Sequence, residues 1–485
     1  MPNSTQPKVL IVGAGLGGLC LGILLEHAGV EFEIFEQASI FKPIGAAVSL
    51  TAGVLACLKQ IGIYEDVVRN SKVARCTKLF NEKRQEYTSI DWSFAKDITG
   101  YDTFIIARPV FYSMLLRQIP LHKIHMGKKV LGLQQNESGV TLFCSDNRSY
   151  FGDLLVGADG TSSIVRTNMY TQMKNRNVLP LADEAEMRYT CECLVGQTKA
   201  LDSRLFPELK QDTCILNTIV GYDGPYKWAT LTTGHSISWG VYHFFNDKDT
   251  KEKRNRDLSS QHPSSSTLSS SSESSHSYGS QKYTEWGPEA TDIMCNNVRD
   301  FAVPGGNGKL TMGDLIDNTS RDFIAKGMMA ERVFETWSDG RIVLLGDACH
   351  PMDPYGGQGA VNAMQDAIAL ANWINVLPSR SQKDIEAIYE EYKAERLPSA
   401  KKSFQATRLI SLTNERGVAG TCSRFVAKKT PVWIRRYMAR KMAQARPQVS
   451  FLPCVPDQGE MAAVEQPSYT KTKHLAEQKA ARKTY

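Results

Sequence analysis

Glycines with the spacing of nucleotide-binding chemistry follow the first apolar run of the chain, KVLIV (8–12), in the stretch GAGLGG (13–18). Gly13 permits a tight turn, Gly15 lets the backbone approach a pyrophosphate, and Gly18 lets a helix pack closely on a strand. A helix that begins here, closed by Gly29, would direct free N–H groups at the phosphates. The stretch predicts a dinucleotide site; a glycine-rich turn without a ligand is the alternative.

A carboxylate completes this first unit. The apolar run FEIF (32–35) ends in Glu36, about twenty residues after the glycines. A carboxylate at this place accepts a hydrogen bond from a ribose 2′-hydroxyl. Glu36 therefore favours an adenosine diphosphate moiety without a 2′-phosphate.

Two more carboxylates stand at the ends of apolar runs. Asp159 follows DLLVGA (153–158), and Asp347 follows RIVLL (341–345) by one residue. Parallel strands place such residues at the carboxyl edge of the sheet, where ligands bind. For Asp159 a plain turn-forming role is the alternative. Beyond Asp347, the stretch PYGGQG (354–359) opens a helical pattern that runs to Leu377.

The chain resembles a known family through four motifs in order. They are GAGLGG at Gly13, Ala107-Arg108-Pro109, GADGTSSIVR at Gly157 and GDACHPMDPYGGQGAVNAMQDA at Gly346. They resemble the class A FAD-dependent monooxygenases, the para-hydroxybenzoate hydroxylase-like family that includes fungal FAD epoxidases and hydroxylases. The likeness spans roughly residues 8–401.

This resemblance implies roles for polar residues of the motifs. Glu36 would bind the adenosine ribose of FAD, and Arg108 would lie near the pyrophosphate. Asp159 belongs to a motif that serves both FAD and NAD(P)H, and Asp347 would hold the ribityl chain. For Arg108, a surface ion pair is the alternative.

Small residues have implied roles beside the flavin ring. Gly356, Gly357 and Ala360 would face the ring with their backbone, where side chains would block close stacking. The run KPIGAAVSL (42–50) matches the family segment that lies against the flavin, so Gly45 and Ser49 are expected backbone contacts.

The activity that the resemblance implies is that of a single-component monooxygenase. FAD is the cofactor, NADPH or NADH the reductant, and one atom of O2 passes to a small organic, apolar or aromatic substrate through a flavin C4a-hydroperoxide. No catalytic side chain is assigned, and no metal site is predicted, because His122 and His125 lack a carboxylate or cysteine companion. A related FAD-dependent reductase without oxygen insertion and a non-catalytic flavin-binding protein are the alternatives.

Three positions depart from the family pattern. Cys349 stands where many members have alanine, and we interpret it as a small buried hydrophobe. Asp353 replaces a small hydrophobic residue, and it either tunes the flavin and its substrate or points to solvent. Val195 replaces an arginine that some members carry, which puts chemistry dependent on that arginine in doubt.

The predicted fold class is α/β: a Rossmann-like FAD-binding domain with an inserted, mainly antiparallel β-sheet substrate domain and a C-terminal helical region. Alternating residues at 228–233 and 237–245 predict antiparallel strands. The expected segments are 1–75, 101–180 and 336–400 for the FAD domain, 76–100 and 181–335 for the substrate domain, 401–445 for C-terminal helices and 446–485 for a polar, basic, frayed tail.

Two features of the predicted substrate domain concern its surface and its interior. Thirteen of the 22 residues at 259–280 are serine, so we expect a disordered insertion at 247–285. Trp239, Tyr242 and Phe244 either line an apolar substrate cavity or pack within the sheet.

Charge and cysteine usage bear on partners and location. The net charge is +6, and residues 431–485 alone carry ten basic and four acidic residues. We interpret this tail as a solvated basic segment, with peripheral contact with an anionic membrane surface or RNA as the alternative, and it does not indicate a nucleic-acid protein. Eleven cysteines without a disulfide pattern, and no signal peptide or membrane span, predict an intracellular, cytoplasmic protein. The sequence does not predict the oligomeric state.

Overall fold

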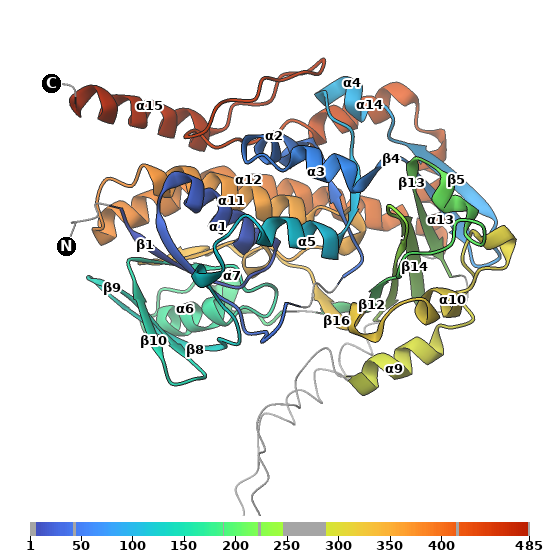
Figure 1. Ribbon diagram of the computed structural model, residues 1–485, viewed down its shortest axis with the longest axis horizontal. Helices are drawn as coiled ribbons and strands as arrows, with labels where there is room; N and C mark the ends of the chain where they lie inside the picture. The colour runs from blue at the N-terminus through green and yellow to red at the C-terminus, as the bar shows by residue number, and fades with distance from the viewer. Residues whose placement is uncertain are drawn as a thin grey trace, which may run out of the picture.

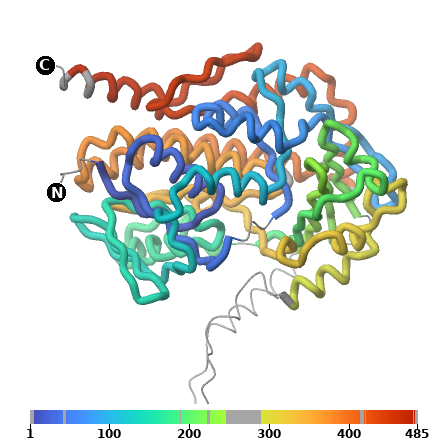
Figure 2. Tube along the Cα trace, in the orientation of Figure 1, coloured from blue at the N-terminus to red at the C-terminus, as the bar shows by residue number. Residues whose placement is uncertain are grey.

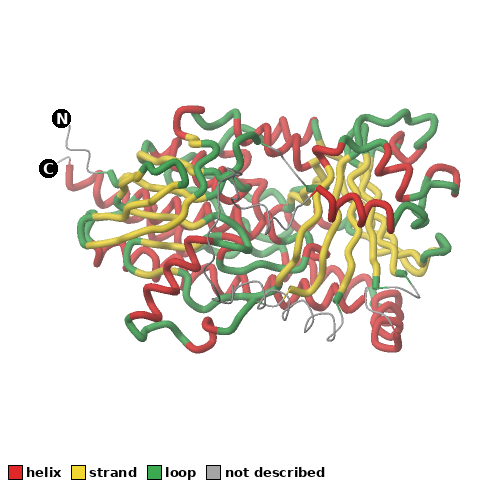
Figure 3. The backbone as a smooth tube through the Cα atoms, turned by 90° about the horizontal axis from the view of Figure 1, so that it is seen from below, coloured by secondary structure: helices red, strands yellow, loops and turns green. Residues whose placement is uncertain are grey.

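The computed structural model describes residues 6–41, 45–187, 189–221, 225–245, 288–413 and 417–483. The serine-rich stretch, expected to be disordered, lies outside the described residues. Figure 3 shows the strands in two groups at opposite ends of the molecule, with long helices running between them. The two groups correspond to the cofactor and substrate parts expected from the sequence.

The first sheet has six strands in the order β17-β18-β11-β1-β2-β7. All pairs are parallel except β17 with β18. The strands are β1 (Lys8–Val12), β2 (Glu31–Phe35), β7 (Ile124–His125), β11 (Leu154–Gly157), β17 (Ser338–Asp339) and β18 (Ile342–Leu344). The apolar runs at 8–12, 32–35, 153–158 and 341–345 thus form adjacent strands, which confirms the Rossmann-like core.

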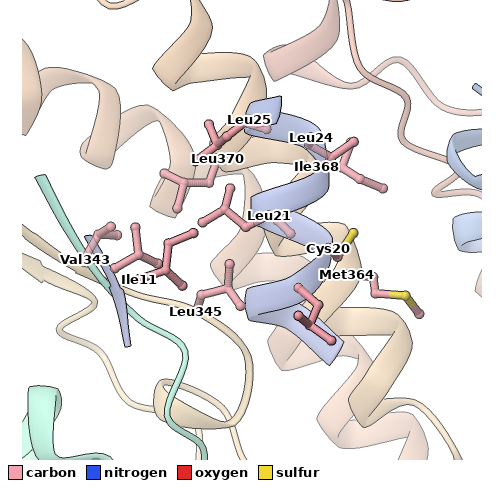
Figure 4. Close-up of a cluster of buried hydrophobic side chains, with 14 of the residues drawn as sticks. Ile11, Cys20, Leu21, Leu24, Leu25, Val343, Leu345, Met364, Ile368 and Leu370 are labelled. Atoms are coloured by element: carbon pink, nitrogen blue, oxygen red, sulfur yellow. The ribbon is translucent and has the colours of Figure 1, made fainter. Parts of the chain in front are cut away.

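Two helices bury one face of this sheet. They are α1 (Leu16–Ala28) and α11 (Gly359–Asn375), which pack against each other. Figure 4 shows their apolar side chains, among them Leu21, Leu24 and Ile368, meeting those of Ile11 and Val343 from the strands. Gly29 ends α1 in a left-handed conformation with φ 68°, as expected of a glycine cap.

The second sheet has nine strands, in the order β16-β12-β15-β14-β13-β4-β6-β3 with β5 paired to β4. Its neighbours are antiparallel except for β13 with β4. The strands are β3 (Ala47–Leu50), β4 (Ser71–Asn81), β5 (Glu86–Asp91), β6 (Phe104–Ala107), β12 (Tyr189–Gln197), β13 (Thr213–Val220), β14 (Tyr226–Thr232), β15 (Ile237–Phe244) and β16 (Ile324–Ala330). The mainly antiparallel substrate sheet is confirmed. However, β3 and β6 come from segments expected in the FAD domain, so the two domains share a boundary strand pair.

The remaining elements surround these sheets. A small antiparallel sheet orders β10 (Ser149–Gly152), β9 (Gly139–Cys144) and β8 (Val130–Asn136). The shorter helices are α2 (Ala52–Gln60), α3 (Tyr64–Arg69), α4 (Ala95–Thr99), α5 (Arg108–Leu116), α6 (Ile164–Asn175), α7 (Leu181–Glu184), α9 (Pro288–Asn297) and α10 (Met312–Asp317).

The C-terminal part is more ordered than expected. Helix α12 (Gln382–Thr413) continues through Pro398, although a proline inside a helix costs about 3 kcal/mol. Helices α13 (Gly417–Lys429) and α14 (Val432–Met442) follow. In the described ranges, no helix has the length and apolar character needed to cross a membrane.

The expectation of a frayed C-terminal end is wrong. The chain returns along α11 and α12 and ends in α15 (Pro467–Lys483), as the red segment of Figure 2 shows. Ser468 and Thr472 are fully buried, and the Ser468 backbone N–H donates to the Glu395 carboxylate of α12 at 2.7 Å. Small hydroxyl residues in a polar sequence thus make a buried contact that composition alone does not reveal.

Candidate functional site

A cavity of about 1140 Å³ collects the predicted cofactor residues. Its wall includes Gly15, Glu36, Arg108, Asp159 and Asp347. These residues come from four separate stretches of the chain and are brought together at the carboxyl edge of the six-stranded sheet. The same cavity continues under one face of the nine-stranded sheet.

The glycines of the turn after β1 have two different roles. Gly13 has φ +101°, and a Cβ there would lie 2.4 Å from the Ala158 carbonyl oxygen. A Cβ on Gly18 would lie 2.1 Å from the Gly13 carbonyl oxygen. In contrast, a Cβ on Gly15 would meet no atom within 4 Å, and Gly15 alone of the three lines the cavity. Gly13 and Gly18 therefore shape the turn, and Gly15 leaves room for a ligand at the start of α1.

Glu36 closes the turn from the end of β2. Its carboxylate accepts hydrogen bonds from the backbone N–H groups of Ala14 and Ala38, both at 2.9 Å. Tyr112 of α5, which sequence reasoning missed, donates its hydroxyl to the Ala14 carbonyl at 2.7 Å. Burial raises the pKa of Tyr112, so its hydroxyl stays a donor. The carboxylate of Glu36 is thereby fixed at the cavity wall.

Arg108 begins α5, and its backbone N–H donates to the Ala46 carbonyl at 3.1 Å. Gly45 has φ +123°, and a Cβ there would lie 2.7 Å from Cδ of Arg108, so this glycine admits the arginine side chain. Burial lowers the pKa of Arg108, while the charge of Asp347 acts in the opposite direction. The positive charge of Arg108 therefore lies close enough to the Asp347 carboxylate to interact with it, and both residues line the cavity.

Asp347 stands directly after β18, on a turn in which Gly346 has φ +62°. Burial raises the pKa of its carboxyl, and His350 and Arg108 oppose that rise. Among the described residues, no donor makes a hydrogen bond to this carboxylate. Because the desolvated oxygens are left open to the cavity, they are suited to accept donors from a ligand.

Asp159 follows β11 and holds the start of α6. Its carboxylate accepts the Ser163 hydroxyl at 2.5 Å and the Val165 backbone N–H at 3.1 Å. These bonds lower its pKa, but burial raises it more. The turn-forming role and a place in the cavity wall therefore coexist in this residue.

The segment that leads into α11 forms part of the cavity wall. Gly357, with φ +60°, lies beside Ser49 of β3, and both line the cavity. Gly356 also lines it, and a Cβ there would lie 2.3 Å from the Thr407 hydroxyl of α12. Ala360 is not among the lining residues and packs against the core, whereas Gln358 and Val361 take part in the wall.

A buried charge network behind this wall was missed by sequence reasoning. The Asp366 carboxylate accepts the Gly346 backbone N–H at 3.0 Å, contacts His350 Nε2 at 2.6 Å and accepts Arg396 Nε at 2.7 Å. Burial raises the pKa of Asp366, but His350 and Arg396 more than offset it and hold it below the ordinary value. The network ties the Asp347 turn to α11 and α12. Its only sequence signal is that Asp366 lies within the long motif at Gly346.

The structure bears on the role of Cys349 and on the presence of potential metal ligands. Cys349 is fully buried, and burial raises the pKa of its thiol, which confirms the small hydrophobe. Cys349, His350 and Asp366 form the one group of three potential metal ligands found within the described ranges, but Arg396 already neutralises the aspartate. His122 is exposed and is not part of that group.

The substrate side of the cavity is an apolar sheet face. Its lining residues come from β4, β12, β13, β14, β15 and β16, and they include Cys193, Val195, Leu216, Ala229, Leu231, Tyr242 and Met328. Val195 thus places an apolar side chain where some family members have arginine.

The grouping of Trp239 with Tyr242 was wrong. Successive residues of a strand point to opposite faces, so residues three apart do not share one. Trp239 and Val241 are fully buried in a second core on the far side of the sheet, while Tyr242 lines the cavity. Phe244 is not among the cavity-lining residues and lies under the Lys227 ammonium, 4.0 Å from it.

Asp353 does not point to solvent. Its side chain is only 6% exposed and accepts the Ser411 hydroxyl of α12 at 2.8 Å. Burial and the neighbouring Asp353 raise the pKa of Glu331 to about 7. Two carboxyl groups therefore share a site where β16 meets the flavin motif.

Comparison with known proteins places this architecture. The family model described as FAD binding domain matches residues 6–193 and 313–407. The aurachin C monooxygenase/isomerase of Stigmatella aurantiaca is 25% identical, covering 91% of this chain and 96% of its own. The FAD-dependent monooxygenase pynG of Aspergillus niger is 27% identical, covering 89% and 93%.

Among solved structures, HpxO of Klebsiella pneumoniae complexed with FAD and uric acid superimposes with a TM-score of 0.64 at 18% identity, covering 90% of this chain and 96% of its own. At this identity the likeness shows the fold. The family model covers more than half of the chain, on the segments that build the cavity. The chain therefore belongs to the FAD-binding-domain family, and with it to the class A FAD-dependent monooxygenases.

Proposed function

We propose that the protein is a single-component, NAD(P)H-dependent monooxygenase that inserts one atom of O2 into a small apolar or aromatic molecule. The observation that carries this proposal is the single cavity that joins the residues of the cofactor motifs to the apolar face of the nine-stranded sheet. A cofactor held at one end and a substrate held at the other would share a space from which water is excluded. Such exclusion protects a reactive oxygen-transfer step from hydrolysis.

The residues present fit FAD. Open space beside Gly15 at the start of α1 suits a pyrophosphate, and Glu36 lies where the adenosine ribose would bind. The unshared carboxylate of Asp347 suits the ribityl hydroxyls, and Arg108 supplies the nearby positive charge.

Other groups would position the ring and the reductant. The first N–H groups of α11, next to Gly357 and Ser49, suit the negative charge of a reduced flavin ring. Gly45, Gly356 and Ala360 remain expected backbone neighbours of that ring, and Asp159 remains the expected link to NAD(P)H. Reduced by NADPH or NADH, FAD supplies the activation of O2 and the transfer of one oxygen atom.

Oxygen incorporation tests this function. Purified FAD-loaded protein is supplied with NADPH or NADH and candidate apolar metabolites under 18O2. We expect one compound to accelerate NAD(P)H oxidation and to gain one 18O atom, with the second atom in water. A metabolite comparison between wild-type and deletion strains identifies the compounds to test.

The alternatives give different results in the same assay. A related reductase would consume NAD(P)H and alter the compound without 18O. A non-catalytic flavin-binding protein would retain FAD, and no compound in a broad library would accelerate flavin reduction. Either result would contradict the monooxygenase proposal.

We also propose a cytoplasmic location. All eleven cysteines are free thiols, nine of them buried or partly buried, as suits a reducing compartment. Cell fractionation with an antibody to the full chain tests this, and recovery from a secreted fraction would contradict it.

A further inference from the structure

Exposed apolar side chains gather near the C-terminal helices. Ten of the 22 exposed large hydrophobic side chains in the described part of the chain fall within residues 409–442. We call these residues the α13–α14 surface: Leu409, Leu412, Val418, Phe425, Val426, Val432, Trp433, Tyr437, Met438 and Met442. Single exposed hydrophobics are ordinary, but such a concentration of them on consecutive helices indicates a binding surface.

The spacing places these side chains on helix faces. On α13, Phe425 and Val426 lie seven and eight residues after Val418. On α14, Tyr437 lies four residues after Trp433, and Met442 four after Met438. Residues at these intervals share one side of a helix. Phe425 is 62% exposed and Trp433 71%, so these faces are not covered by the described protein.

Positive charge surrounds the apolar faces. Residues 417–445 contain seven basic residues and no acidic one. Arg436 and Arg440 share Glu460 as a partner, which offsets only one of these charges. An apolar face with tryptophan and phenylalanine, bordered by lysine and arginine, is typical of helices that lie in a membrane interface.

The same helices line the cavity from the inside. Ala406 and Ile410 of α12, Ala427 of α13 and Ala439 of α14 belong to its wall, and Met442 at the end of α14 borders both the cavity and the exposed surface. In Figure 1, α14 lies at the outer edge of the molecule. The outer faces of these helices are thus exposed and apolar, while their inner faces border the space that reaches the cofactor residues.

We propose that the α13–α14 surface docks on an anionic lipid membrane and that the cavity receives its apolar substrate from that membrane. Only the second half of this proposal rests on the proposed function. A second copy of the chain fits the surface poorly, because a two-fold contact would bring the exposed Lys428, Lys429 and Arg440 of one protomer against the same residues of the other. Membrane contact, the alternative to a solvated basic tail, is thus proposed for α14, the first helix of that tail, together with α13.

Vesicle flotation of the FAD-loaded full chain tests the docking. We expect the protein to float with vesicles of phosphatidylcholine and phosphatidylserine, and to float much less with phosphatidylcholine alone or at high salt. In the double variant Phe425→Ser/Trp433→Ser, the affinity for these vesicles should fall by about tenfold or more. The charge-reversed variant Lys428→Glu/Lys429→Glu should lose binding by a similar factor.

Matched control variants lie elsewhere on the surface. Leu121 and Leu181 are 76% and 83% exposed, so Leu121→Ser/Leu181→Ser removes similar apolar area outside the docking surface. Lys174→Glu/Lys309→Glu reverses two exposed charges outside it. Both controls should bind vesicles as the wild type does. FAD absorbance and thermal melting verify that every variant is folded.

A second measurement does not depend on the double variants. Brominated lipids should quench tryptophan fluorescence of the wild type on binding, and Trp433→Phe should remove that quenching while the buried Trp239 and Trp337 continue to emit.

Flotation that is absent in the wild type, or equal in wild type and Phe425→Ser/Trp433→Ser, would overturn the proposal. So would a dimer that the double variant dissolves without any vesicle binding, because the surface would then be a self-interface.

The docking and the monooxygenase activity can fail separately. Vesicle binding needs no turnover, so it stands even if no 18O is incorporated. Conversely, if docking is correct and substrate arrives from the membrane, turnover of a vesicle-borne apolar substrate should fall in the double variant. Turnover of the same substrate in detergent should not fall.

Discussion

On the cofactor side of the cavity, hydrogen bonds hold two of the three acidic side chains in place, Glu36 through Ala14 and Ala38, and Asp159 through Ser163 and Val165. The third, Asp347, keeps its oxygens open to the cavity. On the substrate side, the wall is one face of a sheet and consists mainly of apolar side chains, exemplified by Val195 and Leu231. One side has a fixed arrangement suited to an invariant ligand. The other side can change by single substitutions without loss of the fold, which is how one scaffold serves many substrates.

The largest effect should come from the network behind the cofactor side. Asp366→Asn leaves the charge of Arg396 buried beside a neutral side chain, which costs about 3–5 kcal/mol. Urea unfolding of wild type and variant measures this. Glu460→Gln, which removes the exposed partner of Arg436 and Arg440, is the control and should change the stability far less, because solvent screens exposed ion pairs. If both variants lost the same free energy of unfolding, the buried network behind the cofactor side would stabilise the protein no more than an exposed ion pair does.

Two glycine variants on the cofactor side distinguish a glycine that the fold of the turn requires from a glycine that leaves room for the ligand. Gly18→Ala forces a Cβ to 2.1 Å from the Gly13 carbonyl and should destabilise the apoprotein by about 1–3 kcal/mol. Gly15→Ala meets no atom within 4 Å and has φ −69°, so it should fold normally and weaken FAD binding. Thermal melting of apoprotein and FAD titration give the two readouts. The interpretation fails if Gly15→Ala destabilises the apoprotein as much as Gly18→Ala does.

Asp347→Ala should weaken FAD binding by about ten- to a hundredfold, since charge-assisted hydrogen bonds contribute roughly 1.5–3 kcal/mol. The fold should survive, because this carboxylate accepts no hydrogen bond within the described residues. Flavin fluorescence measures affinity, and circular dichroism monitors folding. Asp317→Ala, which removes an exposed partner of Arg299, is the control and should leave FAD affinity unchanged. Unchanged affinity in folded Asp347→Ala would refute the assignment.

The smallest effect concerns the carboxyl pair where the two sides meet. The folded-state pKa of Glu331, about 7, lies above its ordinary value of 4.5, so the folded state binds more protons between these pH values. Stability should therefore fall as pH rises from about 5 to 7, by about 1–2 kcal/mol after allowance for solvent screening. Urea unfolding at pH 5 and pH 8 measures the fall, and Glu331→Gln should reduce it. Identical pH profiles would show that the pair does not titrate in this range.

The cofactor side could be predicted from the sequence because its constraints are local. The glycines at 13–18, the runs before Asp159 and Asp347, and the start of α11 each depend on neighbours within a few residues. Asp366 could not be assigned, since its partners Arg396 and Gly346 lie 30 and 20 residues away. The burial of Ser468 and the continuation of α12 through Pro398 likewise depend on tertiary packing that overrides local propensity.

The substrate side could be predicted only as a sheet. Alternation located β14 and β15, and it already separates Trp239 from Tyr242, so their grouping was an avoidable error. Which face of the sheet borders the cavity, in contrast, depends on tertiary packing. The C-terminal helices were predicted only as a helical region, because which of their faces stays exposed depends on the packing of the rest of the chain. Their use can be tested only with a partner present.

The strand order of the six-stranded sheet has a consequence for synthesis on the ribosome. β18 pairs with β11, which precedes it by nearly 190 residues, and α11 packs on α1 from more than 330 residues away. At about 5–20 residues per second, residue 347 is made roughly 17–70 s after the first residue. The nascent N-terminal unit waits for that time with the apolar face of α1 uncovered. The cofactor can be captured only once translation has passed α11, so chains that stop earlier present a chaperone substrate instead of a flavoprotein.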